Sequence, residues 1–296
     1  AQKPLRVTLV LKTVTEVAEF WGTLLSGVEK AAEEYGVELK VLTSPREIDI
    51  DKQIELIRQV TADKPDVMIL SAADYDRCAE ATEEAIAAGI GVVAIDTDVN
   101  AAGRACFVGS NSYEIGLEMG RAMASYLPEG GKVAVIQHML TTTTGIERTR
   151  GVLDALNEAG NIEILGSFCC DNSTEQAQTI TTELLSADPE IRGFVCTNEV
   201  CNVGAANALV ELGMGGRVYV VGCDNSQRQI QFLEQNIIQA IVTQRPFNMG
   251  YVAVQQAVRV ANGEQTDDFV EVSCVLITRE NMYTQENQKL LFPVLR

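Results

Sequence analysis

The chain has 296 residues, of which 46% are hydrophobic and 22% are charged, which is typical of a folded protein rather than a disordered one. Its 41 Asp and Glu residues outnumber its 23 Lys and Arg residues, and the formal net charge of −18 argues against nucleic acid and anionic membrane surfaces as partners. The single histidine, His138, argues against a His-ligated metal centre or a Ser-His-Asp catalyst.

Short apolar runs alternate with amphipathic segments along almost the whole chain. The runs are rich in Val and Ile and mostly lack polar alternation, as strands buried on both faces of a parallel sheet do. The expected strands are Leu5–Leu11, Val37–Leu42, Val67–Leu70, Gly91–Ile95, Val133–Gln137, Ile162–Phe168, Gly193–Cys196 and Val218–Gly222. Between them, apolar residues at spacings of three and four or a terminal glycine predict the helices Glu19–Tyr35, Asp51–Ala62, Ala79–Ala88 and Asn198–Leu212. The pattern predicts an α/β protein with mainly parallel sheets, and the length predicts about two domains.

The strand–helix pattern occurs twice, and each half has a strand that ends in aspartate. One strand ends VVAID at Asp96, and the other ends YVVGCD at Asp224. In open α/β sheets, ligands bind beyond the carboxyl ends of the strands. Either aspartate alone is equally well explained as a turn or helix-capping residue. Two such residues from two halves favour a shared ligand, and carboxylates accept the paired hydroxyl protons of a polyol.

Three further polar residues are candidates for the same edge. Arg148 lies in the polar stretch TTTTGIERTRG that leads into a helix, whereas Arg150 is expected to point elsewhere on that helix. Asn198 follows FVCT and begins a helix, so capping and ligand binding both remain open for it. Gln244 stands in AIVTQRP, where a strand pattern ends before a proline.

Two aromatic residues, Phe20 and Trp21, open the first helix. They fit the hydrophobic core, and they also fit the flat apolar face of a sugar. His138 is expected to be a satisfied polar residue at a strand end rather than a catalyst. No G-x-G-x-x-G follows the first strand and no G-x4-G-K-[ST] occurs, so dinucleotide and nucleotide phosphate sites lack support. We expect no catalytic residue, no cofactor and no metal site.

The eight cysteines and the start of the chain bear on its compartment. No C-x-x-C pair occurs, and several cysteines lie inside apolar runs, so we expect buried thiols or at most one disulfide. No run of about 18 or more apolar residues predicts a membrane span. The chain opens directly in a strand pattern, which is compatible with a cytoplasmic protein or with an exported one whose signal segment is absent.

Seven short motifs occur in the order and spacing of one family. Together they resemble the type I periplasmic sugar-binding proteins, in particular the ribose-binding and D-allose-binding group. The resemblance covers essentially the whole chain and is carried by VLKT (10–13), FW (20–21), AID (94–96), R-x-x-G (148–151), TNE (197–199), VVGCD (220–224) and TQRP (243–246).

The resemblance implies two Rossmann-like domains with parallel sheets, joined by a three-crossover hinge that closes on a ligand. The implied N-terminal lobe comprises 1–109 plus 245–272, and the C-terminal lobe comprises 110–244 plus 273–296. Phe20 and Trp21 would stack on the sugar faces, and Lys12 matches a lysine of the allose-binding branch. The residues implied to bind the hydroxyls and the ring oxygen are Asp96, Arg148, Asn198, Asp224 and Gln244.

The function implied by the resemblance is that of an extracytoplasmic receptor of an ABC sugar importer. It would bind a monosaccharide, an aldohexose or a pentose, in an interdomain cleft without turnover. Its partners would be the transporter permease and a chemoreceptor, with no nucleic acid, and the receptor would be a monomer. Its place would be the periplasm or the cell exterior, anchored to the membrane as a lipoprotein.

Departures from the family pattern leave the identity of the sugar open. The Asn-Pro that precedes the aromatic pair in the family is absent, and Thr97 stands where ribose binders have Arg. Cys169 lies near the position of a family Phe, and Arg279–Arg296 extends past the usual end of a short ribose binder. Alternatives are the effector domain of a lactose-repressor-type regulator, which would carry an N-terminal helix-turn-helix, and a binder of inositol or another polyol. An enzyme would need a nucleotide fingerprint or a credible acid/base pair.

Overall fold

The computed structural model describes residues 3–14 and 19–292, and the chain forms two compact units within it. The first unit comprises residues 1–110, 141–143 and 245–272, and the second comprises 111–140, 144–244 and 273–296. The chain passes from one unit to the other at 110–111, 244–245 and 272–273, and the three-residue segment 141–143 is grouped with the first unit. Residues 1–2, 15–18 and 293–296 lie outside the described residues.

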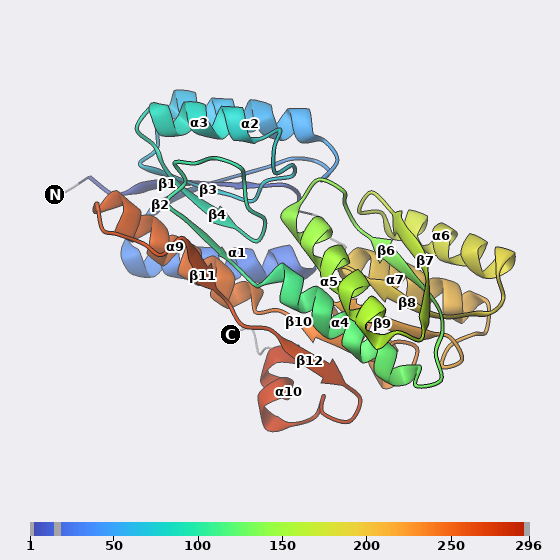
Figure 1. The fold of residues 1–296 in the computed structure, drawn as a ribbon. Helices are drawn as coiled ribbons and strands as arrows, with labels where there is room; N and C mark the ends of the chain where they lie inside the picture. Colours follow the sequence, from blue (N-terminus) through green and yellow to red (C-terminus); the bar gives the residue numbers. More distant parts are fainter. Residues whose placement is uncertain (1–2, 15–18, 293–296) are drawn as a thin grey trace. The chain divides into compact units, whose positions relative to one another are not determined.

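The first unit is built on a six-stranded parallel sheet with the order β11-β5-β4-β3-β1-β2. Its strands are β1 (Arg6–Leu11), β2 (Glu38–Thr43), β3 (Val67–Leu70), β4 (Gly91–Ile95), β5 (Cys106–Gly109) and β11 (Phe269–Glu271). Its helices are α1 (Glu19–Tyr35), α2 (Ile50–Asp63), α3 (Ala79–Ala87) and α9 (Pro246–Ala261). Figure 1 shows α2 and α3 over one face of this sheet and α1 and α9 over the other.

Alternate side chains of the central strands point to opposite faces of this sheet, as the pleat of a strand requires. Val7 and Leu9 of β1 pack with α1 and α9, whereas Val10 packs with α2 and α3. In β3, Ile69 packs with α1 and α9, and Met68 packs with α2 and α3. Because both faces are covered, the central strands have almost no polar residues, which is why they could be recognised in the sequence.

The second unit has a six-stranded sheet with the order β12-β10-β9-β8-β6-β7, in which only the pairing of β12 with β10 is antiparallel. Its strands are β6 (Gly131–Gln137), β7 (Ile162–Cys169), β8 (Ile191–Cys196), β9 (Tyr219–Cys223), β10 (Ala240–Thr243) and β12 (Val275–Thr278). Its helices are α4 (Ser112–Tyr126), α5 (Thr143–Ala159), α6 (Thr174–Ala187), α7 (Glu199–Glu211), α8 (Gln227–Glu234) and α10 (Gln285–Leu291). Val133 and Val135 of β6 pack with α4 and α5, and Ala134 and Ile136 pack with α6, α7 and α8.

Two glycines allow α4 and α5 to approach each other closely. A Cβ atom added to Gly151 of α5 would lie 2.2 Å from the carbonyl oxygen of Tyr113 in α4. A Cβ atom added to Gly116 of α4 would lie 2.2 Å from the carbonyl oxygen of Arg148 in α5. Each glycine therefore lies against the backbone of the partner helix, and this contact fixes the turn of α5 that carries Arg148.

The α/β class and the two mainly parallel sheets are confirmed, and the prediction that the strands are buried on both faces is wrong for the edge strands. β2 and β7 each end a sheet, and much of β2 is exposed. An edge strand has no neighbour on one side and less cover, so polar residues such as Glu38 and Lys40 are tolerated in β2. The sequence prediction also missed β5, β11 and β12, of which β11 and β12 are edge strands with few buried residues.

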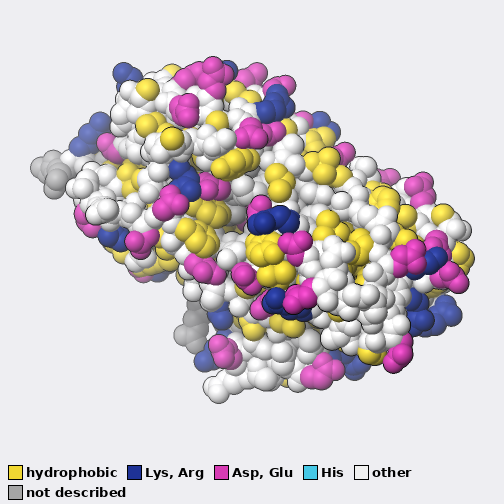
Figure 2. Space-filling model, viewed as in Figure 1, with side chains coloured by type: hydrophobic (Ala, Val, Ile, Leu, Met, Phe, Trp, Pro, Cys, Tyr) yellow, Lys and Arg dark blue, Asp and Glu magenta, His cyan; other side chains and the backbone are white. Residues whose placement is uncertain are grey.

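The negative charge is spread over the surface. In the face shown in Figure 2, Asp and Glu side chains (magenta) are interspersed with Lys and Arg side chains (dark blue). Several of these charges form exposed ion pairs, such as Lys52 with Glu55 and Arg58 with Glu84. Exposed ion pairs of this kind contribute little to the free energy of unfolding. We interpret the net charge of −18 as mainly that of side chains exposed to solvent.

Six of the eight cysteines are buried, and the described residues form no disulfide. Cys169 and Cys274 are half-buried. Burial raises the pKa of Cys78 and of Cys106 to about 11, and it raises the pKa of Cys223 well above its usual value. The thiolate is the reactive form, so these buried thiols are protected both by burial and by protonation.

We therefore expect a thiol reagent at pH 8 to modify no more than two thiols of the native protein, Cys169 and Cys274. Cys169 is expected to react slowly, because burial also raises its pKa to about 11. All eight should react once urea unfolds the chain. Titration with Ellman's reagent, with and without urea, measures both numbers, and rapid reaction of more than two native thiols would contradict the burial of the others.

Candidate ligand-binding site

In the first unit, two predicted site residues directly follow strands that end at the same edge of the sheet. Lys12 follows β1 and Asp96 follows β4, and both side chains are buried. Asp96 has a φ of +62° and donates its backbone N–H to the carbonyl oxygen of Val108 at 2.9 Å. This left-handed conformation costs a residue with a side chain about 1–2 kcal/mol, and aspartate tolerates it better than most. No helix follows Asp96, so it is a turn residue and not a helix cap.

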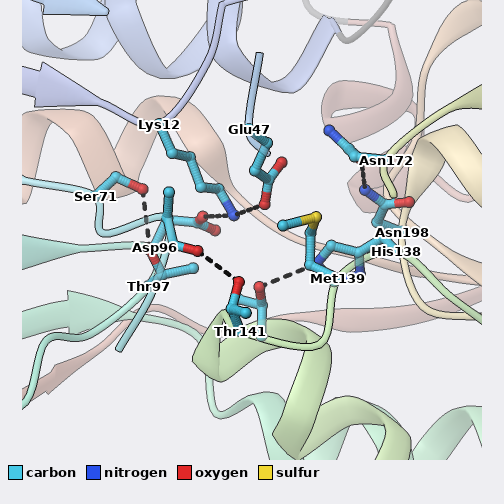
Figure 3. A network of polar contacts seen from close by, with 12 residues as sticks. Lys12, Glu47, Ser71, Asp96, Thr97, His138, Met139, Thr141, Asn172 and Asn198 are labelled. Carbon is cyan, nitrogen blue, oxygen red and sulfur yellow. Dashed lines mark hydrogen bonds and ion pairs between the residues drawn. The ribbon is translucent and has the colours of Figure 1, made fainter. Parts of the chain in front are cut away.

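The Lys12 ammonium group lies between two carboxylates (Figure 3). Its Nζ is 2.8 Å from Oε1 of Glu47 and 3.5 Å from Oδ2 of Asp96. It also lies 5.6 Å from the centroid of the Trp21 ring. We call Lys12, Glu47 and Asp96 the Lys12 cluster. The structure thus brings Lys12 and Asp96 together and adds Glu47, which the sequence prediction missed.

The aromatic pair at the start of α1 divides between the core and the surface. Trp21 is 5% exposed and packs with the hydrophobic core on the α1 face of the sheet. Phe20 is half-buried and contacts Trp21 edge-on, with the ring centroids 5.1 Å apart and the planes at 87°. Trp21 is therefore part of the hydrophobic core, and Phe20 is more accessible to solvent than Trp21.

In the second unit, Asp224 repeats the conformation of Asp96 at the end of β9. Its φ is +78°, and its backbone N–H donates to the carbonyl oxygen of Val242 at 2.9 Å. Its Oδ1 accepts a hydrogen bond from Nε2 of Gln244 at 2.8 Å, and its Oδ2 accepts one from the backbone N–H of Glu199 at 2.9 Å. Glu199 is the first residue of α7, where the helix dipole favours a negative charge. The helix cap that follows Asp224 is Ser226, so Asp224 is not the cap of α8.

Arg148 lies in the second turn of α5 and is 3% exposed. Its Nη1 donates to the carbonyl oxygen of Thr197 at 2.8 Å, which ties α5 to the end of β8. Arg150, two residues further on, is exposed, and its guanidinium carbon lies 4.2 Å from the centroid of the Tyr113 ring. The two arginines therefore point in different directions, as the sequence analysis expected.

Asn198 caps α7 and also contacts a second amide. Its Oδ1 accepts from the backbone N–H of Cys201 at 3.1 Å, and its Nδ2 donates to Oδ1 of Asn172 at 2.9 Å (Figure 3). The capping interpretation of Asn198 is thus confirmed, and its half-buried amide remains at the edge of the sheet where Asp224 and Gln244 also lie.

His138 is a satisfied polar residue of the core. Its backbone N–H donates to Oγ1 of Thr197 at 3.0 Å, its Nδ1 lies 2.7 Å from the same hydroxyl, and its Nε2 lies 3.2 Å from Oγ1 of Thr144. Thr97 is likewise engaged, because its Oγ1 donates to the carbonyl oxygen of Ala72 at 2.7 Å.

The described ranges hold no group of three or more His, Cys, Asp and Glu side chains that could bind a metal ion. Within the same ranges, every helix is too short or too polar to cross a membrane.

Comparison with known proteins places the chain in a family. Residues 8–265 match the model of the periplasmic binding protein domain. The chain is 26% identical to a D-ribose/D-allose-binding protein of Pseudomonas aeruginosa, over 94% of this chain and 89% of that protein. It is 25% identical to the D-allose-binding periplasmic protein of Escherichia coli, over 92% of this chain and 91% of that protein.

A solved structure shares the fold over almost the whole chain. It is a carbohydrate transporter solute binding protein from Agrobacterium radiobacter, solved in complex with D-arabinose. The TM-score is 0.94 and the identity 23%, covering 98% of this chain and 100% of that one. The fold, the order of the strands and the match over residues 8–265 lead to one conclusion, that the chain belongs to the periplasmic binding protein domain family.

Proposed function

We propose that this protein is the solute-binding component of an ABC sugar importer and that it binds a monosaccharide without turning it over. The observation that carries the proposal is the repeated strand-end aspartate. Asp96 and Asp224 are both buried, both adopt a left-handed backbone conformation, and each is held by buried polar neighbours. The relatives are named for D-ribose and D-allose, and the solved neighbour for D-arabinose, which supports an aldose as the ligand.

The chemistry of these side chains suits hydroxyl groups. A sugar leaves water only where each hydroxyl finds a partner, because an unpaired buried polar group costs about 1–3 kcal/mol. Lys12, Arg148, Asn198 and Gln244 offer donors, and the two aspartates offer acceptors. Hydrogen bonds to charged groups are about twice as strong as those between neutral groups, so Asp96, Asp224 and Arg148 should contribute most of the affinity.

We further propose that one sugar is bound by residues of both units, with Phe20 and Trp21 against its apolar faces. A ligand that makes more bonds in a closed state than in an open one shifts the equilibrium toward closure. The closed form would then be recognised by the transporter permease and by a chemoreceptor. Small-angle X-ray scattering tests closure, because the radius of gyration should fall when the sugar is added.

The family is periplasmic by name, and we propose that the protein acts in the periplasm or at the cell exterior as a monomer tethered as a lipoprotein. Expression of the full gene, followed by membrane fractionation, tests the tether. Recovery of all the protein in the soluble fraction would contradict it.

Calorimetric titration with D-ribose, D-allose, D-arabinose and myo-inositol tests the proposed function. We expect at least one aldose to bind, and we expect Asp96→Asn and Asp224→Asn each to weaken that binding by about 10–100-fold, the value of one hydrogen bond to a charged group. Asparagine is used because it also tolerates the left-handed conformation.

The matched control is Asp188→Asn. Asp188 forms an ion pair with Lys132 at the start of β6, with Nζ and Oδ2 2.8 Å apart, at the opposite end of that strand from His138. Its loss should leave the sugar affinity unchanged. Equal affinity in the wild type and in both site variants would refute the proposed role of the aspartates, and tight binding of myo-inositol alone would make the ligand a cyclic polyol.

A further inference from the structure

Glu47 lies closer to the Lys12 ammonium than the strand-end aspartate does. The distance from Lys12 Nζ is 2.8 Å to Glu47 and 3.5 Å to Asp96, and Figure 3 shows the ammonium between the two carboxylates. Glu47 lies in the segment between β2 and α2. Because β2 pairs with β1, this segment begins beside the end of β1, which Lys12 follows. Lys12 is thus paired mainly with Glu47, and its pairing with Asp96 is the weaker of the two.

The Lys12 cluster has more negative than positive charge. Lys12, Glu47 and Asp96 are 3%, 4% and 5% exposed as whole residues, and their two carboxylates lie beside one ammonium. A buried charge is costly unless it is paired and hydrogen-bonded. With one cation for two anions, these three side chains together have a formal charge of −1.

Two more buried hydroxyl groups adjoin the ends of the same strands. Thr13 lies two residues beyond β1 and Ser44 directly follows β2, and each is 1% exposed. Among the described residues, neither Thr13 Oγ1 nor Ser44 Oγ has a hydrogen-bond partner. Native structures leave few buried polar atoms unsatisfied, so this edge of the sheet has unused hydrogen-bonding groups that a neutral polar ligand would fill.

The second unit also has buried charged residues near its strand ends. Arg148, Glu199 and Asp224 are all buried, and the backbone N–H of Glu199 binds the carboxylate of Asp224.

We infer that Glu47 is a positioning and selectivity residue for the ligand: it holds Lys12 away from Asp96 and makes the site select neutral sugars over anionic ones. The inference rests on the proposed function. While Glu47 is charged, Asp96 remains available to accept hydroxyl protons. An anionic group on the ligand, such as a phosphate ester or a carboxylate, would instead meet an excess of buried negative charge, and such a juxtaposition is strongly unfavourable.

The test compares neutral and anionic forms of one sugar. The probe is whichever of D-ribose, D-allose and D-arabinose binds the wild type most tightly, together with its terminal phosphate ester. We expect the wild type to bind the neutral sugar at least about 100-fold more tightly than the ester. In Glu47→Gln this ratio should fall by about 10-fold, because the neutral sugar loses affinity as Lys12 turns to Asp96 and the ester meets one negative charge fewer. Steric exclusion of the phosphate alone would leave the ratio unchanged.

Two further variants separate charge from packing. Glu47→Asp keeps the charge and shortens the side chain, so it should weaken the neutral sugar while it preserves the discrimination. Glu118→Gln removes a half-buried carboxylate on α4 of the second unit, which is not one of the proposed site residues, and should change neither quantity.

Three results would overturn the inference. One is a wild type that binds the phosphate ester as tightly as the neutral sugar. Another is a Glu47→Gln variant that is folded by circular dichroism and discriminates as strongly as the wild type. The third applies if Glu47→Gln does not fold: a Glu47→Asp variant that no longer discriminates between the neutral sugar and its phosphate ester would also refute the inference. A wild type that binds no neutral sugar at all would instead refute the proposed function, and the inference with it.

Discussion

Replacing Gly151 by alanine is expected to lower the free energy of unfolding of the second unit by about 1–2 kcal/mol. The added Cβ atom would lie 2.2 Å from the carbonyl oxygen of Tyr113, so α4 and α5 must move apart. Overpacking of this kind typically costs about 1–3 kcal/mol, and here the obstacle is backbone rather than a flexible side chain. The gain in helix propensity from glycine to alanine, about 1 kcal/mol, offsets only part of the cost. Urea unfolding followed by far-ultraviolet circular dichroism measures the change.

The control for this substitution is Gly22→Ala in α1, where an added Cβ atom meets no atom within 4 Å. Here the propensity gain acts alone, so stability should be unchanged or should rise by up to about 1 kcal/mol. The single tryptophan, Trp21, lies in the first unit, so its fluorescence reports on that unit separately. A Gly151→Ala variant as stable as the wild type would show that the two helices are free to separate.

Replacing Arg148 by methionine is expected to reduce the affinity for the bound aldose by about 100-fold or more. Methionine has a similar length and is apolar, so it removes the donors and the positive charge while it fills much of the space. Truncating one member of a buried, charged hydrogen-bonding set typically costs about 2–5 kcal/mol. The substitution also removes the donor to the Thr197 carbonyl. Calorimetric titration with the sugar that binds best provides the measurement.

Arg150→Met is the matched control, because Arg150 lies on the same helix and is exposed. Its contacts are with Glu147 and with the Tyr113 ring. The proposed site should be unaffected by its loss, so sugar affinity should stay the same and stability should change by less than about 1 kcal/mol. Equal losses of affinity in the two variants would indicate a general effect of charge and would refute a direct role of Arg148.

The sequence predicts the central parts of this fold well and its margins poorly. Strands such as β3 and β4 are covered on both faces, so burial leaves an uninterrupted apolar run that is visible without a structure. The edge strands lack that cover. β11 has three residues, and its place beside β5 follows from the return of the chain through α9, not from any local pattern.

The candidate site shows the same division. Asp96 and Asp224 could be found because each follows a buried strand, and the strand-end rule places them at the ligand edge. Glu47 follows no strand directly, and only the three-dimensional arrangement brings it 2.8 Å from Lys12. The available signal for Glu47 was a charged residue soon after β2, the strand that neighbours β1. The signal is weak, because loops in a chain this acidic contain many such residues. Trp21 illustrates the reverse case, because its position beside a strand end did not reveal how deeply it packs into the core.

The left-handed backbone at Asp96 and Asp224 restricts how the specificity of this protein can be changed. Outside glycine, asparagine and aspartate, a side chain at these positions adds strain before any ligand is considered. A randomised library at residues 96 and 224 should therefore return mostly those three residue types among its folded members, whatever sugar is used for selection. New ligand preferences are more accessible at residues with ordinary backbone angles, so protein engineering of this receptor should begin beside the two aspartates.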